Sequence, residues 1–246
     1  MGKGSQYWKQ LIQDAISGGR LTLFAQMVMG LHKEERLQIE VVGRLKDENG
    51  DLVPADQFIP MANRHRLTPA FDLAILQKLF ERMSNGVIAD QEVAINLSVH
   101  SIHDATLLYW LTNAMRADRN LSRRLVFEFT EFGLVQDKVG GEKFVAEIRK
   151  LGANFAVDNF GLHPSAFEYL QQLKPRYVKL SPAYIRELAN NQKHQFFISS
   201  VVMITRPLEI QVIALGIENV DSLALLKDLG VDGYQGFVTG KLLEIV

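Results

Sequence analysis

Polar side chains interrupt several short apolar segments of this sequence, near the points where buried strands would end. They are Glu40, Arg44, Asn96, Glu128, Glu131, Asp158, Lys179 and Gln235. Each costs several kcal/mol to bury unless it is paired or bound to a cation. A single buried acid is usually a satisfied structural residue, whereas several on successive segments favour one shared site.

The oxygen-bearing members of this group indicate the kind of metal that they could hold. Carboxylate and amide oxygens, without histidine or cysteine, suit a hard divalent cation such as Mg²⁺, Mn²⁺ or Ca²⁺. Such cations commonly bind phosphate oxygens in barrel enzymes, so a phosphate ester is the expected ligand. The HSIH stretch at 100–103 lacks the HExxH spacing of a zinc-binding helix and makes zinc a poor alternative.

Composition describes an ordinary globular chain. Of its 246 residues, 47% are hydrophobic and 22% are charged, and the formal net charge is -1. This balance gives no global field for nucleic acid or an acidic membrane surface, so we expect no direct nucleic-acid binding. The arginine-rich stretch at 116–124 lies between a helical pattern and a strand, where we expect a solvated loop.

The chain contains no cysteine, which excludes disulfides and thiolate metal sites and fits a reducing compartment. It also lacks a run of about 18 apolar residues that could span a bilayer. Residues 1–6, which begin MGKGS, resemble a remnant or linker, and we expect a single domain over 7–246. If this domain comes from a longer protein, its lack of a membrane segment says nothing about the parent.

Eight short apolar segments recur along the chain, with helical patterns between most of them. The segments span 21–28, 39–45, 93–98, 125–131, 155–160, 177–181, 211–217 and 233–237. Helical spacing is clear at 71–83 and 142–152. This alternation predicts an α/β fold, a (β/α)8 TIM-like barrel with functional groups at the carboxyl ends of its strands. The first two segments are joined too briefly for a helical crossover, so they should pair antiparallel.

These segments resemble a known family in order and spacing. IEVVGRL, AINLS, FEFTE, VDNFG, YVKLS, IALGIE and YQGF correspond to the EALLR, NLS, ExTE, DDFG, KID, AEGVE and QGY motifs of EAL domains, the phosphodiesterases of cyclic di-GMP. The resemblance covers nearly the whole chain. It implies a (β/α)8 barrel with an antiparallel first strand.

The resemblance also implies roles for individual residues. The ligands of the first metal match Glu40, Asn96, Glu128 and Asp158. Contacts to the dinucleotide match Gln26, Arg44, Lys179 and Gln235, and the lysine is also the one near the attacking water. Glu131 matches a glutamate that braces the loop after segment 155–160.

Two departures from the family pattern bear on activity. Asn159 replaces the second aspartate of DDFG, and Leu215 replaces the first glutamate of AEGVE. In the family both positions belong to the second metal, and two-metal catalysis uses the pair of ions to generate hydroxide. We therefore expect hydrolysis largely to fail, with Lys179 as a vestige of the catalytic site. Ser181 also stands where KID has its acid.

The loop after Asp158 departs from the family as well. The family has the glycine-rich sequence DFGTGYSS there, whereas this chain reads NFGLHPSA. His163 and Pro164 replace residues that let the loop reach the site.

Three classes of function remain open. KLSPAYIREL and ISGGRL resemble the CsrD and MshH subgroup, which implies a non-catalytic regulator of small-RNA decay whose protein partner is the glucose-specific phosphotransfer protein. The retained first-metal residues instead favour a cyclic di-GMP receptor, as in LapD and FimX. A weak phosphodiesterase is the third alternative. The regulator requires no cofactor, whereas the receptor and the enzyme would use one Mg²⁺, Mn²⁺ or Ca²⁺. Each of the three functions fits a cytoplasmic domain of a bacterial protein. The parent protein could be anchored in the inner membrane, and the domain could form a homodimer.

Overall fold

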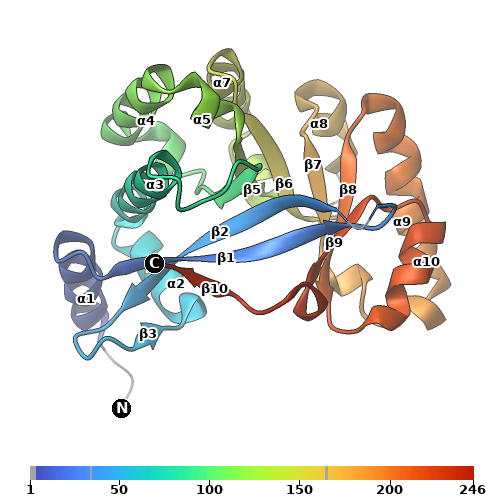
Figure 1. The fold of residues 1–246 in the computed structure, drawn as a ribbon, viewed down its shortest axis with the longest axis horizontal. Helices are drawn as coiled ribbons and strands as arrows, with labels where there is room; N and C mark the ends of the chain where they lie inside the picture. The colour runs from blue at the N-terminus through green and yellow to red at the C-terminus, as the bar shows by residue number, and fades with distance from the viewer. Residues whose placement is uncertain (1–3, 34, 164–165) are drawn as a thin grey trace.

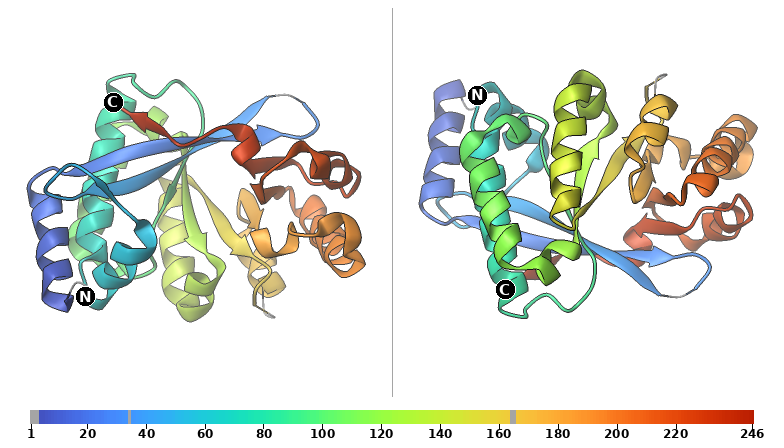
Figure 2. Two further views of the ribbon diagram at one scale, coloured as in Figure 1. Left: turned by 90° about the horizontal axis from the view of Figure 1, so that it is seen from below. Right: turned by 90° about the horizontal axis from the view of Figure 1, so that it is seen from above.

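The computed structural model describes residues 4–33, 35–163 and 166–246. Its centre is a closed barrel of eight strands with helices on the outside, an α/β TIM-like fold (Figure 1, Figure 2). This confirms the fold class predicted from the alternation of apolar segments and helical patterns.

Each of the eight predicted segments forms one strand of the barrel. The strands are β1 (Leu21–Gly30), β2 (Arg36–Lys46), β4 (Val93–Asn96), β5 (Leu125–Thr130), β6 (Asn154–Phe160), β7 (Tyr177–Leu180), β8 (Gln211–Ile217) and β9 (Gly233–Gly236). β1 runs antiparallel to both of its barrel neighbours, β2 and β9. The other neighbouring pairs are parallel. The antiparallel first strand is therefore confirmed.

Two further strands lie outside the closed barrel. β3 (Leu52–Val53) pairs with β2, and β10 (Leu243–Ile245) pairs with β1. Both are antiparallel to the strand that they extend. Such short strands carry too few residues for an alternating pattern, which is why the sequence did not reveal them.

The helices surround the barrel. They are α1 (Ser5–Ser17), α2 (Ala55–Arg64), α3 (Thr68–Ser84), α4 (Ala105–Ala117), α5 (Arg119–Arg123), α6 (Glu131–Gln136), α7 (Lys138–Lys150), α8 (Ala166–Leu173), α9 (Gln192–Thr205) and α10 (Leu223–Asp228). The helical patterns at 71–83 and 142–152 correspond to α3 and α7. None of the helices that the structure describes is long and apolar enough to cross a membrane.

The loop conformation expected at 116–124 is wrong, because Arg119–Arg123 form the short helix α5, although 116–120 and Arg123 are exposed as expected. Asp118 begins the helix by accepting a hydrogen bond from the backbone N–H of Leu121 at 2.9 Å. Leu121 is buried, and the Arg124 guanidinium donates to the carbonyl of Gln91 at 3.1 Å. The helix cap at Asp118 and the burial of Leu121 therefore stabilise a helix that the charge pattern alone did not predict.

The N-terminal boundary of the domain stays a prediction. Helix α1 begins at Ser5, and the Ser5 hydroxyl lies 2.9 Å from Nε2 of His65. Residues 1–3 of the expected linker lie outside the described residues.

Inward-facing side chains form two layers inside the barrel, because alternate residues of a strand face the same side. The lower layer contains Val28, Gln38, Ala94, Val126, Ala156, Tyr177 and Ile213. The upper layer, one step further toward the carboxyl ends of the parallel strands, contains Gln26, Glu40, Asn96, Glu128, Asp158, Lys179, Leu215 and Gln235. Most of the predicted polar residues thus lie together in the upper layer, next to a mostly apolar lower layer.

Candidate functional site

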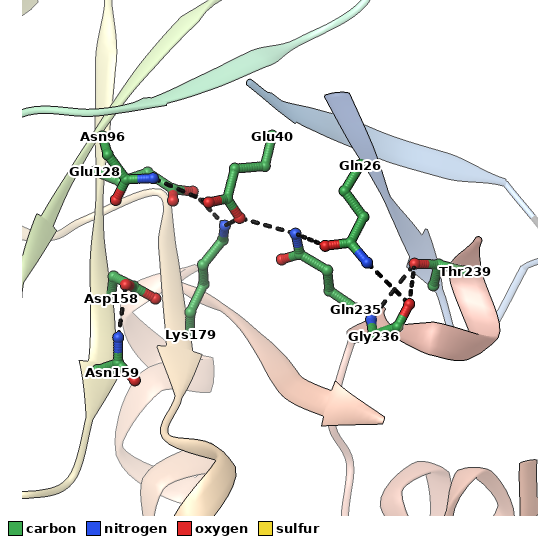
Figure 3. A network of polar contacts seen from close by, with 10 residues as sticks. All are labelled: Gln26, Glu40, Asn96, Glu128, Asp158, Asn159, Lys179, Gln235, Gly236 and Thr239. Atoms are coloured by element: carbon green, nitrogen blue, oxygen red, sulfur yellow. Dashed lines mark hydrogen bonds and ion pairs between the residues drawn. The ribbon is translucent and has the colours of Figure 1, made fainter. Parts of the chain in front are cut away.

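Lys179 lies at the centre of the upper layer, with a side chain that is fully buried. Its Nζ is 2.7 Å from Oε2 of Glu40 and 2.5 Å from Oε1 of Glu128 (Figure 3). Burial would lower the pKa of Lys179, but the negative charges of Glu128, Glu40 and Asp158 outweigh it and raise that pKa. The ammonium is therefore charged and neutralises part of the carboxylate cluster.

Glu40 accepts hydrogen bonds from three different strands. Lys179 Nζ donates at 2.7 Å, Gln235 Nε2 at 2.8 Å and Asn96 Nδ2 at 2.9 Å. Burial alone would raise the pKa of Glu40, but Lys179 and the two amide donors more than offset it, so the pKa is lowered. Glu40 is thus held as a carboxylate.

A second chain of contacts leads from this cluster to β1. Gln235 Nε2 lies 3.3 Å from Oε1 of Gln26 and donates to it. Gln26 Nε2 in turn donates to the carbonyl of Gly236 at 3.0 Å (Figure 3). The two glutamines predicted to contact the dinucleotide are therefore joined to each other and to Glu40.

Glu128 and Asp158 are the least compensated acids of the layer. Burial raises the pKa of Glu128 well above its usual range, and the nearby Glu40 and Asp158 charges add to that rise. Within the described part of the chain, no hydrogen bond reaches Oε2 of Glu128. Burial also raises the pKa of Asp158, whose Oδ2 accepts a 2.8 Å hydrogen bond from Nδ2 of Asn159.

The donor set fits one hard divalent cation at the position of the predicted first metal. Glu40, Asn96, Glu128 and Asp158 bring carboxylate and amide oxygens to one place, which are the ligands that Mg²⁺, Mn²⁺ and Ca²⁺ prefer. The partnerless Oε2 of Glu128 also favours a cation. In the present arrangement the carboxylates face Lys179, and no group of three His, Cys, Asp or Glu side chains among the described residues is arranged to hold a metal. A bound cation would therefore have to compete with Lys179.

The residues do not fit a second metal in the same way. Leu215 lies in the upper layer beside Gln235 and lines a hollow of about 440 Å³ with Gln26, Glu40 and Asp158. A leucine side chain carries no oxygen in any rotamer. The hollow therefore has an apolar wall where the family pattern has a glutamate.

Arg44 and Gln235 line different hollows. Arg44 borders a hollow of about 360 Å³ that also touches Asn96 and Glu128, whereas Gln235 borders the hollow beside Leu215. Asn96 lines the first hollow and Glu40 lines the second, and Asn96 donates a hydrogen bond to Glu40. A ligand that contacted both Arg44 and Gln235 would have to occupy both hollows.

Asp72 is a residue of this region that the sequence reasoning missed. It lies on α3, lines the hollow beside Arg44, and accepts hydrogen bonds from Ser98 N at 3.0 Å and Ser101 Oγ at 2.6 Å. Burial raises its pKa to about 6, although both donors act in the opposite direction. No sequence signal pointed to it, because it falls inside a helical pattern and not at a strand end.

Glu131 lies at the start of α6 and holds the loop after β6. Its Oε2 accepts from the backbone N–H groups of Leu162 at 2.8 Å and His163 at 3.0 Å, and Gly161 N lies 3.2 Å from both carboxylate oxygens. Tyr169 donates a further hydrogen bond to Oε1 at 3.3 Å. These are contacts that a loop-bracing residue makes. Pro164 lies outside the described residues.

A second residue fixes the same loop from its other side. The hydroxyl of Tyr184 donates to the carbonyl of Gly161 at 2.5 Å, and the ring of Tyr184 stacks on that of Phe197 at 4.0 Å between centroids. Tyr184 belongs to the KLSPAYIREL stretch. That stretch therefore contacts a loop that departs from the family pattern.

The model of the EAL domain family matches residues 9–241, nearly the whole barrel. The chain belongs to the EAL domain family. This EAL domain is 29% identical over 237 residues to the cyclic di-GMP phosphodiesterase PdeB of Shewanella oneidensis, a match that covers 95% of this chain and 28% of PdeB. The chain thus spans less than a third of that relative.

Solved EAL structures share the fold. Vibrio cholerae LapD, in an S helix-GGDEF-EAL form bound to c-di-GMP, has a TM-score of 0.88 at 24% identity and covers 96% of this chain and 57% of that one. The FimX EAL domain of Pseudomonas aeruginosa bound to c-di-GMP has a TM-score of 0.88 at 22% identity, with 96% of both chains covered. Klebsiella pneumoniae BlrP1, solved with manganese and cyclic di-GMP, has a TM-score of 0.79 at 22% identity, with 92% of this chain and 57% of that one covered.

The upper layer of this EAL domain contains most of the residues predicted at its site. Two predicted residues lie elsewhere. Arg44 is further along β2, on the wall of the neighbouring hollow, and Glu131 is beneath the loop after β6. The structure thus brings the residues into contact range, while their roles toward metal and ligand stay predictions.

Proposed function

We propose that this EAL domain is a non-catalytic module of cyclic di-GMP signalling proteins that acts through a protein partner. Leu215 is the main support for the loss of catalysis, because its apolar side chain lines the hollow where a second metal would need a carboxylate. Asn159 supports it, since its amide donates to Asp158 and cannot supply a negative charge. Lys179 supports it further, because its ammonium pairs with Glu40 and Glu128 and neutralises part of the acidic cluster without a metal.

The loss of catalysis is tested by the conversion of cyclic di-GMP to the linear dinucleotide with Mg²⁺ or Mn²⁺. Losing the charge stabilisation of one metal is worth several kcal/mol of barrier, so the rate should fall by about 10³-fold or more relative to an active EAL domain. An active relative assayed in parallel supplies the reference. Turnover of about one per second would be that of an ordinary enzyme and would overturn the proposal.

The mode of action that we propose is that of the CsrD and MshH subgroup. The resemblance is carried partly by KLSPAYIREL, whose Tyr184 contacts the loop after β6. The proposed partner is the glucose-specific phosphotransfer protein, and the proposed outcome is control of small-RNA decay. The domain would then belong to the cytoplasmic part of an inner-membrane protein.

Replacing Glu128 and Asp158 with alanine together separates the barrel interior from the outer surface. The double variant leaves one ammonium, Lys179, opposite one carboxylate, Glu40, so one buried positive charge faces one buried negative charge. A variant with Glu128→Gln and Asp158→Asn keeps the shape and serves as the matched control. We expect both variants to fold by circular dichroism, to capture the partner and to support normal small-RNA decay. Loss of partner capture and of small-RNA decay in a folded double variant would place function in the barrel interior.

A cyclic di-GMP receptor is the second candidate function, and the retained polar layer favours it. Gln26, Glu40, Asp158 and Gln235 all border the hollow beside Leu215. Calorimetry with cyclic di-GMP and Ca²⁺ tests binding without turnover. The absence of both heat and a thermal shift at high micromolar ligand would remove this candidate.

A further inference from the structure

Most of the buried polar atoms that lack a partner belong to three residues of the barrel strands. Among the described residues, six buried side-chain nitrogen and oxygen atoms have no hydrogen-bond partner, and five of them belong to Gln38, Glu128 and Gln235. They are both amide atoms of Gln38, both carboxylate oxygens of Glu128 and Oε1 of Gln235. Oε1 of Glu128 faces the Lys179 ammonium at 2.5 Å, which leaves its Oε2 as the uncompensated oxygen.

Gln38 is the polar exception in the lower layer. It lies on β2 two residues before Glu40, pairs across the hairpin with Val28, and is fully buried. Two residues of the layer, Ala94 and Ala156, have small side chains. An amide has two N–H donors and a carbonyl with two acceptor sites, and buried polar groups of this kind are nearly always paired.

The surroundings decide which ligand could pair with this amide. Val28, Val126 and Ile213 make the lower layer apolar, so a charged ligand would be costly to bury there. Lys179 already supplies a positive charge directly above, in the next layer. A neutral molecule that both donates and accepts, and that fits beside alanine side chains, is required.

We infer that the barrel interior contains a structural water site centred on the side-chain amide of Gln38. Buried waters typically make about three hydrogen bonds to polar groups that would otherwise be unpaired. A water here accepts from Gln38 Nε2 or donates to its Oε1. The same water, or a second one in line with it, donates to Oε2 of Glu128 or Oε1 of Gln235 in the layer above. Gln38 is in this way a positioning residue that fixes the deepest acid of the upper layer through water.

The test uses the metal-free domain and the substitution Gln38→Met, which keeps the length of the side chain and removes its hydrogen-bonding groups. Gln171→Met, on the exposed surface of α8, is the matched control for the same exchange. Nuclear Overhauser transfer from water to the Gln38 side-chain amide protons reports a long-lived bound water. A crystal structure of the wild type locates it.

We expect a water signal at the Gln38 amide in the wild type and in Gln171→Met. In Gln38→Met the located water should be lost and the Glu128 side chain should become less ordered. A direct hydrogen bond from Gln38 to Glu128 or Gln235 with no water between them would overturn the inference, as would a cation at this place. If Gln38→Met fails to fold, the signal and the electron density of the wild type decide the question by themselves.

Discussion

The side-chain amide of Asn159 donates a 2.8 Å hydrogen bond to Oδ2 of Asp158, its neighbour on β6. Asn159 adopts a left-handed backbone conformation with φ of 55°, which asparagine tolerates better than most residues. One oxygen of a candidate metal ligand is therefore occupied by a neutral side chain. In the family pattern an aspartate at this place would repel Asp158 unless a cation lay between them.

Restoring the two missing carboxylates should restore part of the hydrolytic activity. We expect Asn159→Asp together with Leu215→Glu to hydrolyse cyclic di-GMP at least about ten-fold faster than the wild type, because the second metal regains its oxygen ligands. The measurement is formation of the linear dinucleotide with Mn²⁺. Adding Glu128→Ala to the double variant should abolish the gain. A double variant no faster than the wild type would show that other features block catalysis.

Replacing Lys179 with methionine should strongly destabilise the fold. The change leaves the carboxylates of Glu40 and Glu128 buried without their cation, and breaking a buried ion pair in this way costs about 3–5 kcal/mol of unfolding free energy. Urea denaturation at neutral pH measures the loss. Lys150→Met removes an exposed pair with Glu147 and should change stability by less than about 0.5 kcal/mol. Equal effects of the two changes would contradict the central role assigned to Lys179.

Asp72 should make the stability of the domain depend on pH between about 4 and 6. Its pKa is raised from 3.8 to about 6 in the folded state by burial, so the folded protein binds a proton more tightly than the unfolded chain. The stabilisation is fully present below the unfolded pKa and is lost as the pH rises through the folded pKa, an effect of about 3 kcal/mol. Urea denaturation at several pH values should show this decline in the wild type and a flatter profile in Asp72→Asn. Parallel profiles would exclude Asp72 as the source.

Gly161 should tolerate alanine much less well than Gly240 does. Both have a positive φ, 106° and 107°, so an alanine is strained at either position. An added Cβ at Gly161 would lie 2.5 Å from the Phe197 ring and 2.7 Å from that of Tyr184, whereas at Gly240 it would meet nothing within 4 Å. Overpacking should make Gly161→Ala costlier than Gly240→Ala by about 1–3 kcal/mol. Thermal denaturation compares the stability of the two variants. A smaller loss of stability for Gly161→Ala than for Gly240→Ala would mean that the rings of Tyr184 and Phe197 move to make room for the added methyl group.

The sequence alone determined the eight barrel strands, and the sequence together with the family resemblance indicated the upper-layer residues. Most of the apolar segments are short and contain Val, Ile or Phe, and most also contain a polar residue, so the local pattern carries the information. The brief connection between β1 and β2 likewise determined their antiparallel pairing, because a parallel crossover needs many more residues. The motif order was enough to recognise the family before any contact was known.

Only the tertiary structure decided how these residues compensate one another. Lys179 and Glu40 are 139 positions apart in the chain, and their 2.7 Å contact depends on the register of strands that meet only when the barrel closes. The sequence did not indicate Asp72 or Gln38 for the same reason. What distinguishes each residue is its burial in the folded protein and not its position in a sequence pattern. The division of the site into two hollows is also a tertiary property. Asn96 borders one hollow and Glu40 the other, and the two residues come from separate strands.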